Sequence, residues 1–76
     1  MNRHGSRVSF KGPEYPKLVR YHQGLRVLTK PVYDWLDTNY FAEMSIEGDG
    51  STNWTVVLDF ASEDGAEAFV NTWGFK

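Results

Sequence analysis

The chain has no cysteine, and this absence excludes a disulfide framework, a thiolate metal site and a cysteine nucleophile. It also lacks any apolar run near the roughly 18 residues that a membrane-spanning helix needs, and its first residues lack the apolar segment of a signal peptide. We therefore expect a cytoplasmic protein with no membrane partner. A chain of 76 residues predicts one domain over residues 1–76, with disorder left open for residues 1–6.

Basic side chains are absent from residues 31–75, where nine acids lie, and Lys76 ends the chain. The first thirty residues carry seven basic side chains and only one acid, Glu14, so their formal charge is +6 and that of the remainder is −8. The net charge of −2 conceals this separation. A charge asymmetry of this kind bears on partners and on electrostatic steering, and not on the fold.

The first thirty residues predict short strands. Residues 7–10 alternate apolar and polar side chains, and the glycine and prolines of residues 12–16 then interrupt regular structure. Residues 18–22 and 25–28 are typical of two strands on either side of Gly24. A short helix over residues 16–23 is the alternative interpretation, and the sequence leaves both open.

Two helices and a hairpin are predicted for the remainder. Thr29 is a candidate N-cap and Pro31 suits the first helical turn, while Ser62 is a second N-cap for a helix that stops at Gly74. Between them, residues 41–47 and 54–60 alternate around a Gly/Asp loop, with Val57 expected to point outward. The expected fold is α+β: a small antiparallel sheet with two helices packed on one face, in the order β(β)-α-β-β-α. One core is expected from Trp35, Leu36, Met44, Trp54, Val56, Leu58, Phe60, Phe69 and Trp73.

The C-terminal half resembles a loose group of small bacteriophage-encoded proteins over about residues 30–75. The segments that carry the resemblance are Val32-Tyr33-Asp34-Trp35-Leu36, Val57-Leu58-Asp59-Phe60, the acidic helix from Glu63 to Phe69, with Gly65 inserted before Ala66, and Trp73-Gly74. The resemblance implies a phage or prophage accessory protein of unsettled chemistry. Phage proteins of this size often bind and block a host enzyme or a defence complex, as anti-CRISPR proteins do.

The acids of the second half are the first candidate site. An ordinary surface mixes charges of both signs, so a long acidic stretch without basic residues indicates a face that docks on a basic surface of a host protein. The carboxylates of such a face could also mimic the phosphates of a nucleic acid; a solvated acidic face is the alternative interpretation. The candidate partner-binding residues are Asp34, Asp37, Glu43, Glu47, Asp49 and Asp59.

The basic first third supports a second hypothesis, a small nucleic-acid-binding module. Its basic residues are interleaved with Phe10, Tyr15 and Tyr21, a mixture that suits phosphate contact and base stacking. The alternative is that these basic residues neutralise the acidic elements within the fold. The candidate nucleic-acid-binding residues are Arg3, Arg7, Lys11, Lys17, Arg20 and Arg26.

No pattern of catalytic residues stands out. His4 and His22 have no nucleophile placed beside them by a motif, and the loop from Glu47 to Ser51 lacks the ligand spacing of a calcium-binding loop. We therefore expect no enzyme activity, no cofactor and no metal. The sequence does not indicate the oligomeric state.

Overall fold

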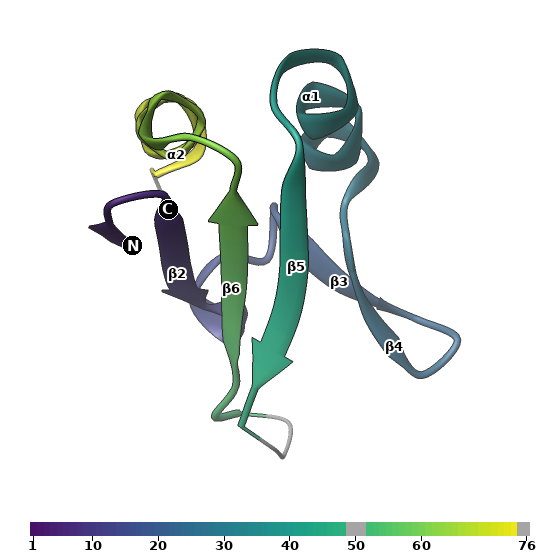
Figure 1. Cartoon of the computed structure of the whole chain (residues 1–76). Helices are drawn as coiled ribbons and strands as arrows, with labels where there is room; N and C mark the ends of the chain where they lie inside the picture. Colours follow the sequence, from purple (N-terminus) through teal and green to yellow (C-terminus); the bar gives the residue numbers. More distant parts are fainter. Residues whose placement is uncertain (49–51, 75–76) are drawn as a thin grey trace.

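The computed structural model describes residues 1–48 and 52–74 (Figure 1), and the expected α+β fold is confirmed. Residues 1–6, for which disorder was left open, contain the first strand. The elements, in chain order, are β1 (Asn2–His4), β2 (Arg7–Lys11), the 3-10 helix η1 (Gly12–Glu14), β3 (Val19–His22), β4 (Leu25–Leu28), α1 (Lys30–Asn39), β5 (Ala42–Glu47), β6 (Thr55–Phe60) and α2 (Glu63–Trp73).

The main sheet has four antiparallel strands in the order β1-β2-β6-β5. Strand β6 is central, because the hairpin with β5 covers one edge and the distant strand β2 covers the other. Val57 lies opposite Ser9 on β2 and Ser45 on β5, so these three side chains share one face of the sheet. The pairing of β2 with β6 therefore brings the basic first third beside the acidic hairpin.

A separate two-stranded ribbon is formed by β3 and β4, which confirms strands and not a helix in this region. Gln23 and Gly24 connect the strands, and both have positive φ angles, +53° and +80°. Two central residues of positive φ are what a tight type I′ hairpin turn requires, and its twist matches that of the strands. Gly24 supplies this conformation easily, whereas Gln23 adopts it despite its side chain.

The core fills the space between one sheet face, the two helices and the segment from η1 to β3. Both helices lie at the top of Figure 1. The ring of Phe69 on α2 packs edge-on against the ring of Trp35 on α1, with 5.9 Å between the ring centroids. Phe69 is fully buried and also contacts the rings of Phe10 and Phe60. Of the residues expected in the core, six are buried: Leu36, Trp54, Val56, Leu58, Phe60 and Phe69.

The remaining core expectations need adjustment. Trp35 and Trp73 are only partly buried, although both pack against the core. The placement of Met44 in the core was wrong, because its side chain is 37% exposed. Met44 lies on β5, which is an edge strand, so its inward side meets a groove and not another layer.

Val57 was expected to point outward, and the strand register confirms this direction. It does lie on the outer sheet face, yet only 4% of its surface is exposed. Its strand, β6, is flanked by β2 on one side and by β5 on the other. Alternation therefore predicted the direction of this side chain and not its burial.

The expected caps are present, with one difference in how they act. Ser62 accepts a hydrogen bond from the backbone N–H of Gly65, as an N-cap serine does. Thr29 stands at the N-cap of α1, but its hydroxyl donates to the carbonyl of Lys17 at 2.8 Å instead of capping the helix. The backbone N–H of Thr29 also donates, to the carbonyl of Leu18. These two bonds fix the start of α1 against the segment that enters β3.

Candidate functional site

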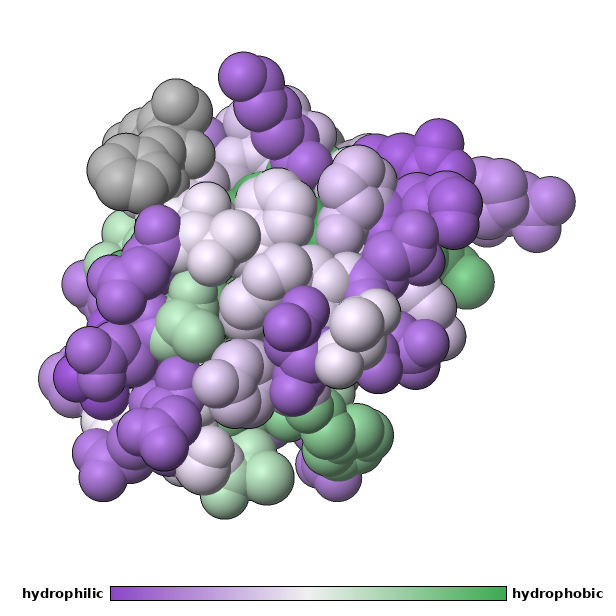
Figure 2. All heavy atoms as spheres, turned by 90° about the horizontal axis from the view of Figure 1, so that it is seen from above, coloured by the Kyte–Doolittle hydropathy of each residue, from purple (hydrophilic) through white to green (hydrophobic). Residues whose placement is uncertain are grey.

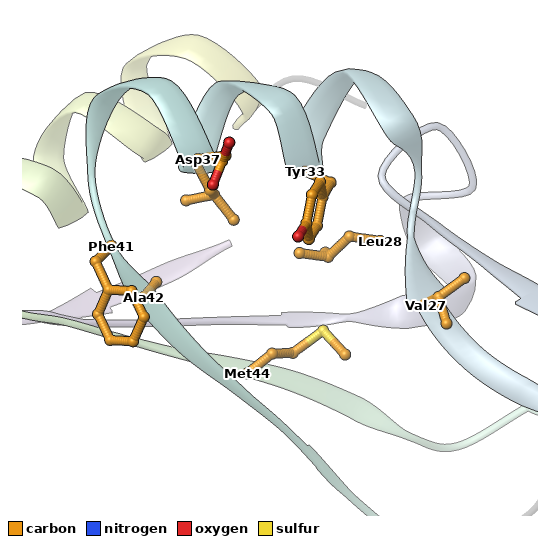
Figure 3. Close-up of a pocket in the computed structure, with 8 residues that line it drawn as sticks. Val27, Leu28, Tyr33, Asp37, Phe41, Ala42 and Met44 are labelled. Carbon is orange, nitrogen blue, oxygen red and sulfur yellow. The ribbon is translucent and has the colours of Figure 1, made fainter.

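An apolar groove of about 420 Å³ lies between α1, β4 and β5. Strand β4 contributes Val27 and Leu28 to its lining, α1 contributes Tyr33, Leu36 and Asp37, and β5 with the residue before it contributes Phe41, Ala42 and Met44. Figure 3 shows Tyr33 extending from the helix toward Leu28, while Met44 rises from β5 below it. Three consecutive elements of the chain, a strand of the small ribbon, a helix and an edge strand of the main sheet, thus surround one hollow.

The groove is open to solvent, and its rim is unusually apolar. Phe41 is 72% exposed and Tyr33 is 61% exposed, next to the partly exposed Met44. Single exposed apolar residues are normal on a protein surface, but several around a concave site mark a binding surface. The space-filling view from above shows apolar residues reaching the surface between hydrophilic ones (Figure 2).

Charge at this site has one sign. Asp37 is the single charged residue among the described residues that line the groove. A second, shallower hollow lies on the other side of Phe41 and is lined by Phe41, Glu43, Asp59, Phe60 and Ala61. Among the described residues, neither hollow has a lysine or arginine in its lining. The exposed ring of Phe41 is therefore bordered by carboxylates.

Strand β5 adds an unused row of backbone groups to the site. Within residues 1–48 and 52–74, β5 pairs with β6 alone, so its other edge carries N–H and C=O groups that alternate along the strand. Natural edge strands are commonly protected by charged side chains, above all lysine, by a proline or by a bulge. The sequence of β5, AEMSIE, has two glutamates but no lysine and no proline, and its register with β6 is uninterrupted.

The acidic candidates lie on two surfaces. Asp34 and Asp37 are on α1, whereas Glu43, Glu47 and Asp59 share the outer sheet face. Asp34 accepts a hydrogen bond from Lys30 at 2.9 Å, one helical turn earlier, so its charge is partly neutralised. Asp49 lies outside the described residues.

The basic candidates are also dispersed. Arg3 lies on β1, Lys17 precedes β3 and Arg20 lies on β3, all with exposed side chains. Arg26, on β4, stacks over the rings of Tyr21 and Trp54 at 5.5 and 4.9 Å. The guanidinium of Arg26 is therefore part of the packing around the core residue Trp54.

Arg7 and Lys11 lie on the outer sheet face among the acids. The guanidinium of Arg7 pairs with Asp59 at 2.7 Å, and Lys11 donates to the side chain of Asn53 at 3.1 Å. The pKa of Arg7 is raised, first by the hydrogen bond to Asp59, then by the charge of Asp59 and, to a smaller extent, of Glu47. Strand pairing thus interleaves the charges that the sequence separates.

The remaining chemistry of the described residues is sparse. No group of three or more histidine, aspartate or glutamate side chains in this part of the chain is arranged to hold a metal ion. His4 and His22 lie on different sheets, and both are exposed. Neither helix in the described part is long and apolar enough to cross a membrane.

Comparison with protein families, with curated proteins and with solved structures gave no match. No family is assigned on this basis.

Sequence reasoning missed the apolar half of the site. Tyr33 and Phe41 were not singled out, and Met44 was placed in the core. A signal was present in Phe41, an apolar side chain at the junction between a helix and an edge strand. Its exposure nevertheless depends on β5 being an edge, which the sequence does not show.

Proposed function

We propose that this chain is a non-enzymatic binding protein that docks on a basic surface of a partner protein through the groove between α1, β4 and β5. The observation that carries the proposal is the exposed apolar rim of Tyr33, Phe41 and Met44, bordered by the carboxylates of Asp37 and Glu43. Apolar anchors within a charged border are the usual composition of a protein interface.

The identity of the partner is the finer part of the proposal. The resemblance to phage accessory proteins supports a host enzyme or a defence complex as the target, with inhibition as the result, in the cytoplasm of an infected bacterium. Mimicry of a nucleic acid receives less support, because Arg7 and Lys11 stand among the outer-face acids. The groove, in whose described lining the charged residue is an acid, is the better docking surface for a basic partner.

The test begins with capture of the partner from bacterial lysate and proceeds to association and dissociation rates with the purified partner. Asp37→Lys should slow association and make it less dependent on salt, because a charge at the rim acts on steering. Phe41→Ala should speed dissociation, with affinity falling on the order of tenfold for an anchor residue. Both side chains are exposed, so thermal melts should show folded proteins.

Three variants away from the groove serve as controls. Glu67→Lys reverses an exposed acid on α2, Leu25→Ala removes an apolar side chain that is 67% exposed, and Arg20→Glu reverses a basic residue on β3. These should bind as the wild type does. If Arg20→Glu weakens binding while Asp37→Lys and Phe41→Ala do not, the groove is not the docking surface.

A further inference from the structure

We infer that the groove receives its partner as an added β-strand: an extended segment pairs with the free edge of β5, and its side chains alternate between apolar and basic residues. This inference rests on the proposed function, since it uses the same groove, and it specifies the shape and chemistry of what binds there. Addition of an extended peptide to an exposed edge is a recurring mode of recognition, in which main-chain hydrogen bonds give affinity and side-chain pockets give specificity.

The geometry of the sheet places the two kinds of side chain. A strand added to β5 would lie about 4.8 Å from it, with alternate side chains on opposite faces. On the inner face its neighbours are Ala42 and Met44, which line the groove together with Val27 and Leu28 of β4. On the outer face its neighbours are Glu43 and Glu47. An apolar residue therefore suits each inward position and a basic residue each outward one.

The same charges argue against a second copy of this chain as the occupant. Two β5 strands could pair edge to edge around a twofold axis, with the apolar side chains of both copies facing the same side. Such pairing would gather Glu43 and Glu47 of both copies on one face. Like charges on neighbouring strands are destabilising, and a self-paired β5 has no basic residue to offset them. A basic segment from another protein would instead place lysine or arginine side chains beside Glu43 and Glu47, so the interactions across the two strands become attractive.

The experiment uses the full chain and a synthetic peptide as long as β5, six residues, in which lysine alternates with valine. Isothermal titration measures binding, and hydrogen exchange followed by NMR reports on each β5 amide. We expect binding that slows exchange at alternate β5 amides. A peptide with glutamate for lysine should lose binding, and one with the lysines and valines in two separate blocks should bind more weakly at the same charge.

Backbone methylation of the peptide tests strand addition directly. An added strand uses the hydrogen-bonding groups of only one of its edges, which belong to alternate residues. N-methylation of the alternate residues whose N–H groups face β5 should abolish binding. N-methylation of the intervening residues, whose N–H groups face away from β5, should leave binding nearly unchanged. Equal effects from both patterns, or no binding by the alternating peptide, would overturn the inference.

The outcomes separate this inference from the proposed function. If Asp37→Lys and Phe41→Ala weaken binding of the captured partner while the methylation patterns act equally, the groove binds a partner by another mode. If sedimentation of the wild-type chain shows a dimer that an exposed β5 variant, Met44→Lys, dissociates, then a second copy occupies the edge and the inference fails.

Discussion

Phe69 is the residue on which the helices and the sheet converge. Its ring is fully buried against Phe10, Trp35 and Phe60. Phe69→Ala should lower the free energy of unfolding by roughly 3–5 kcal/mol, a large share of the stability of so small a domain. Urea denaturation measures the change. Phe41→Ala removes the same ring from an exposed position and should stay within about 0.5 kcal/mol of wild type. Similar losses for both variants would contradict the packing.

Gly12 is a second residue whose identity is dictated by packing, because there is no room for a side chain at this position. A Cβ atom at this position would overlap the ring of Trp54, while the backbone N–H of Gly12 donates to the carbonyl of Trp54 at 3.1 Å. Gly12→Ala should therefore lower the free energy of unfolding by about 1–3 kcal/mol and shift the tryptophan fluorescence. Gly24→Asn is the comparison variant: a Cβ there meets no atom within 4 Å, so any loss of stability comes from the positive φ of this position and not from a steric clash. An unchanged melting temperature for Gly12→Ala would refute this contact.

Single residues also show where alternation is a sufficient guide to burial. It predicted the inward direction of Val56, Leu58 and Phe60, all of which are buried. It also predicted the outward direction of Val57, but it did not predict the burial of Val57 or the exposure of Met44, because burial depends on which strands lie beside and above a residue. Val57 lies on the central strand β6 and is buried, whereas Met44 lies on the edge strand β5 and is exposed. Strand order is a long-range property, so no local pattern contains it.

At the scale of elements, the hairpin of β3 and β4 contains a correctable strain. Gln23 adopts a φ of +53°, which disfavours most side chains, in a turn that prefers asparagine followed by glycine. Gln23→Asn should raise the free energy of unfolding by roughly 0.5–1 kcal/mol, and Gln23→Val should lower it, because a β-branched side chain resists this conformation. Thermal melts of the two variants test the pair. A loss of stability with asparagine would show that the turn has another geometry.

The elements themselves were largely predictable, and the groove between them was not. Caps, proline and glycine positions and apolar spacing located both helices and the hairpin of β5 and β6. The groove requires that β4, α1 and β5 surround one hollow, and the bonds from Thr29 to Lys17 and Leu18 join the start of α1 to the segment before β3. Those bonds join residues that no sequence pattern pairs. Tyr33 and Phe41 could be seen as apolar residues, but not as neighbours.

At the scale of the whole molecule, folding reverses the impression that the charges give along the chain. The sequence separates a basic third from an acidic remainder, yet β2 pairs with β6, so Arg7 and Lys11 stand on one face with Glu43, Glu47 and Asp59. Among the described residues that line the groove, Asp37 is charged and no lysine or arginine is present. Charge along a sequence therefore predicted the presence of an acidic surface and not its location.

The interleaved charges also predict weak binding of nucleic acid. A phosphate backbone that approached Arg7 or Lys11 would meet the outer-face acids, and Arg26 is held against Trp54. Fluorescence anisotropy with single-stranded and duplex DNA and RNA at low salt should therefore give dissociation constants weaker than micromolar. The double variant Glu43→Lys, Glu47→Lys makes the same face basic, and it should gain affinity that falls steeply as salt rises, because phosphate contacts release counterions. A wild-type affinity tighter than micromolar with the same steep salt dependence, reduced by Arg3→Glu or Arg20→Glu, would instead make the basic residues the working surface. The contrast between wild type and double variant isolates the electrostatic effect, since both keep the same aromatic residues for stacking.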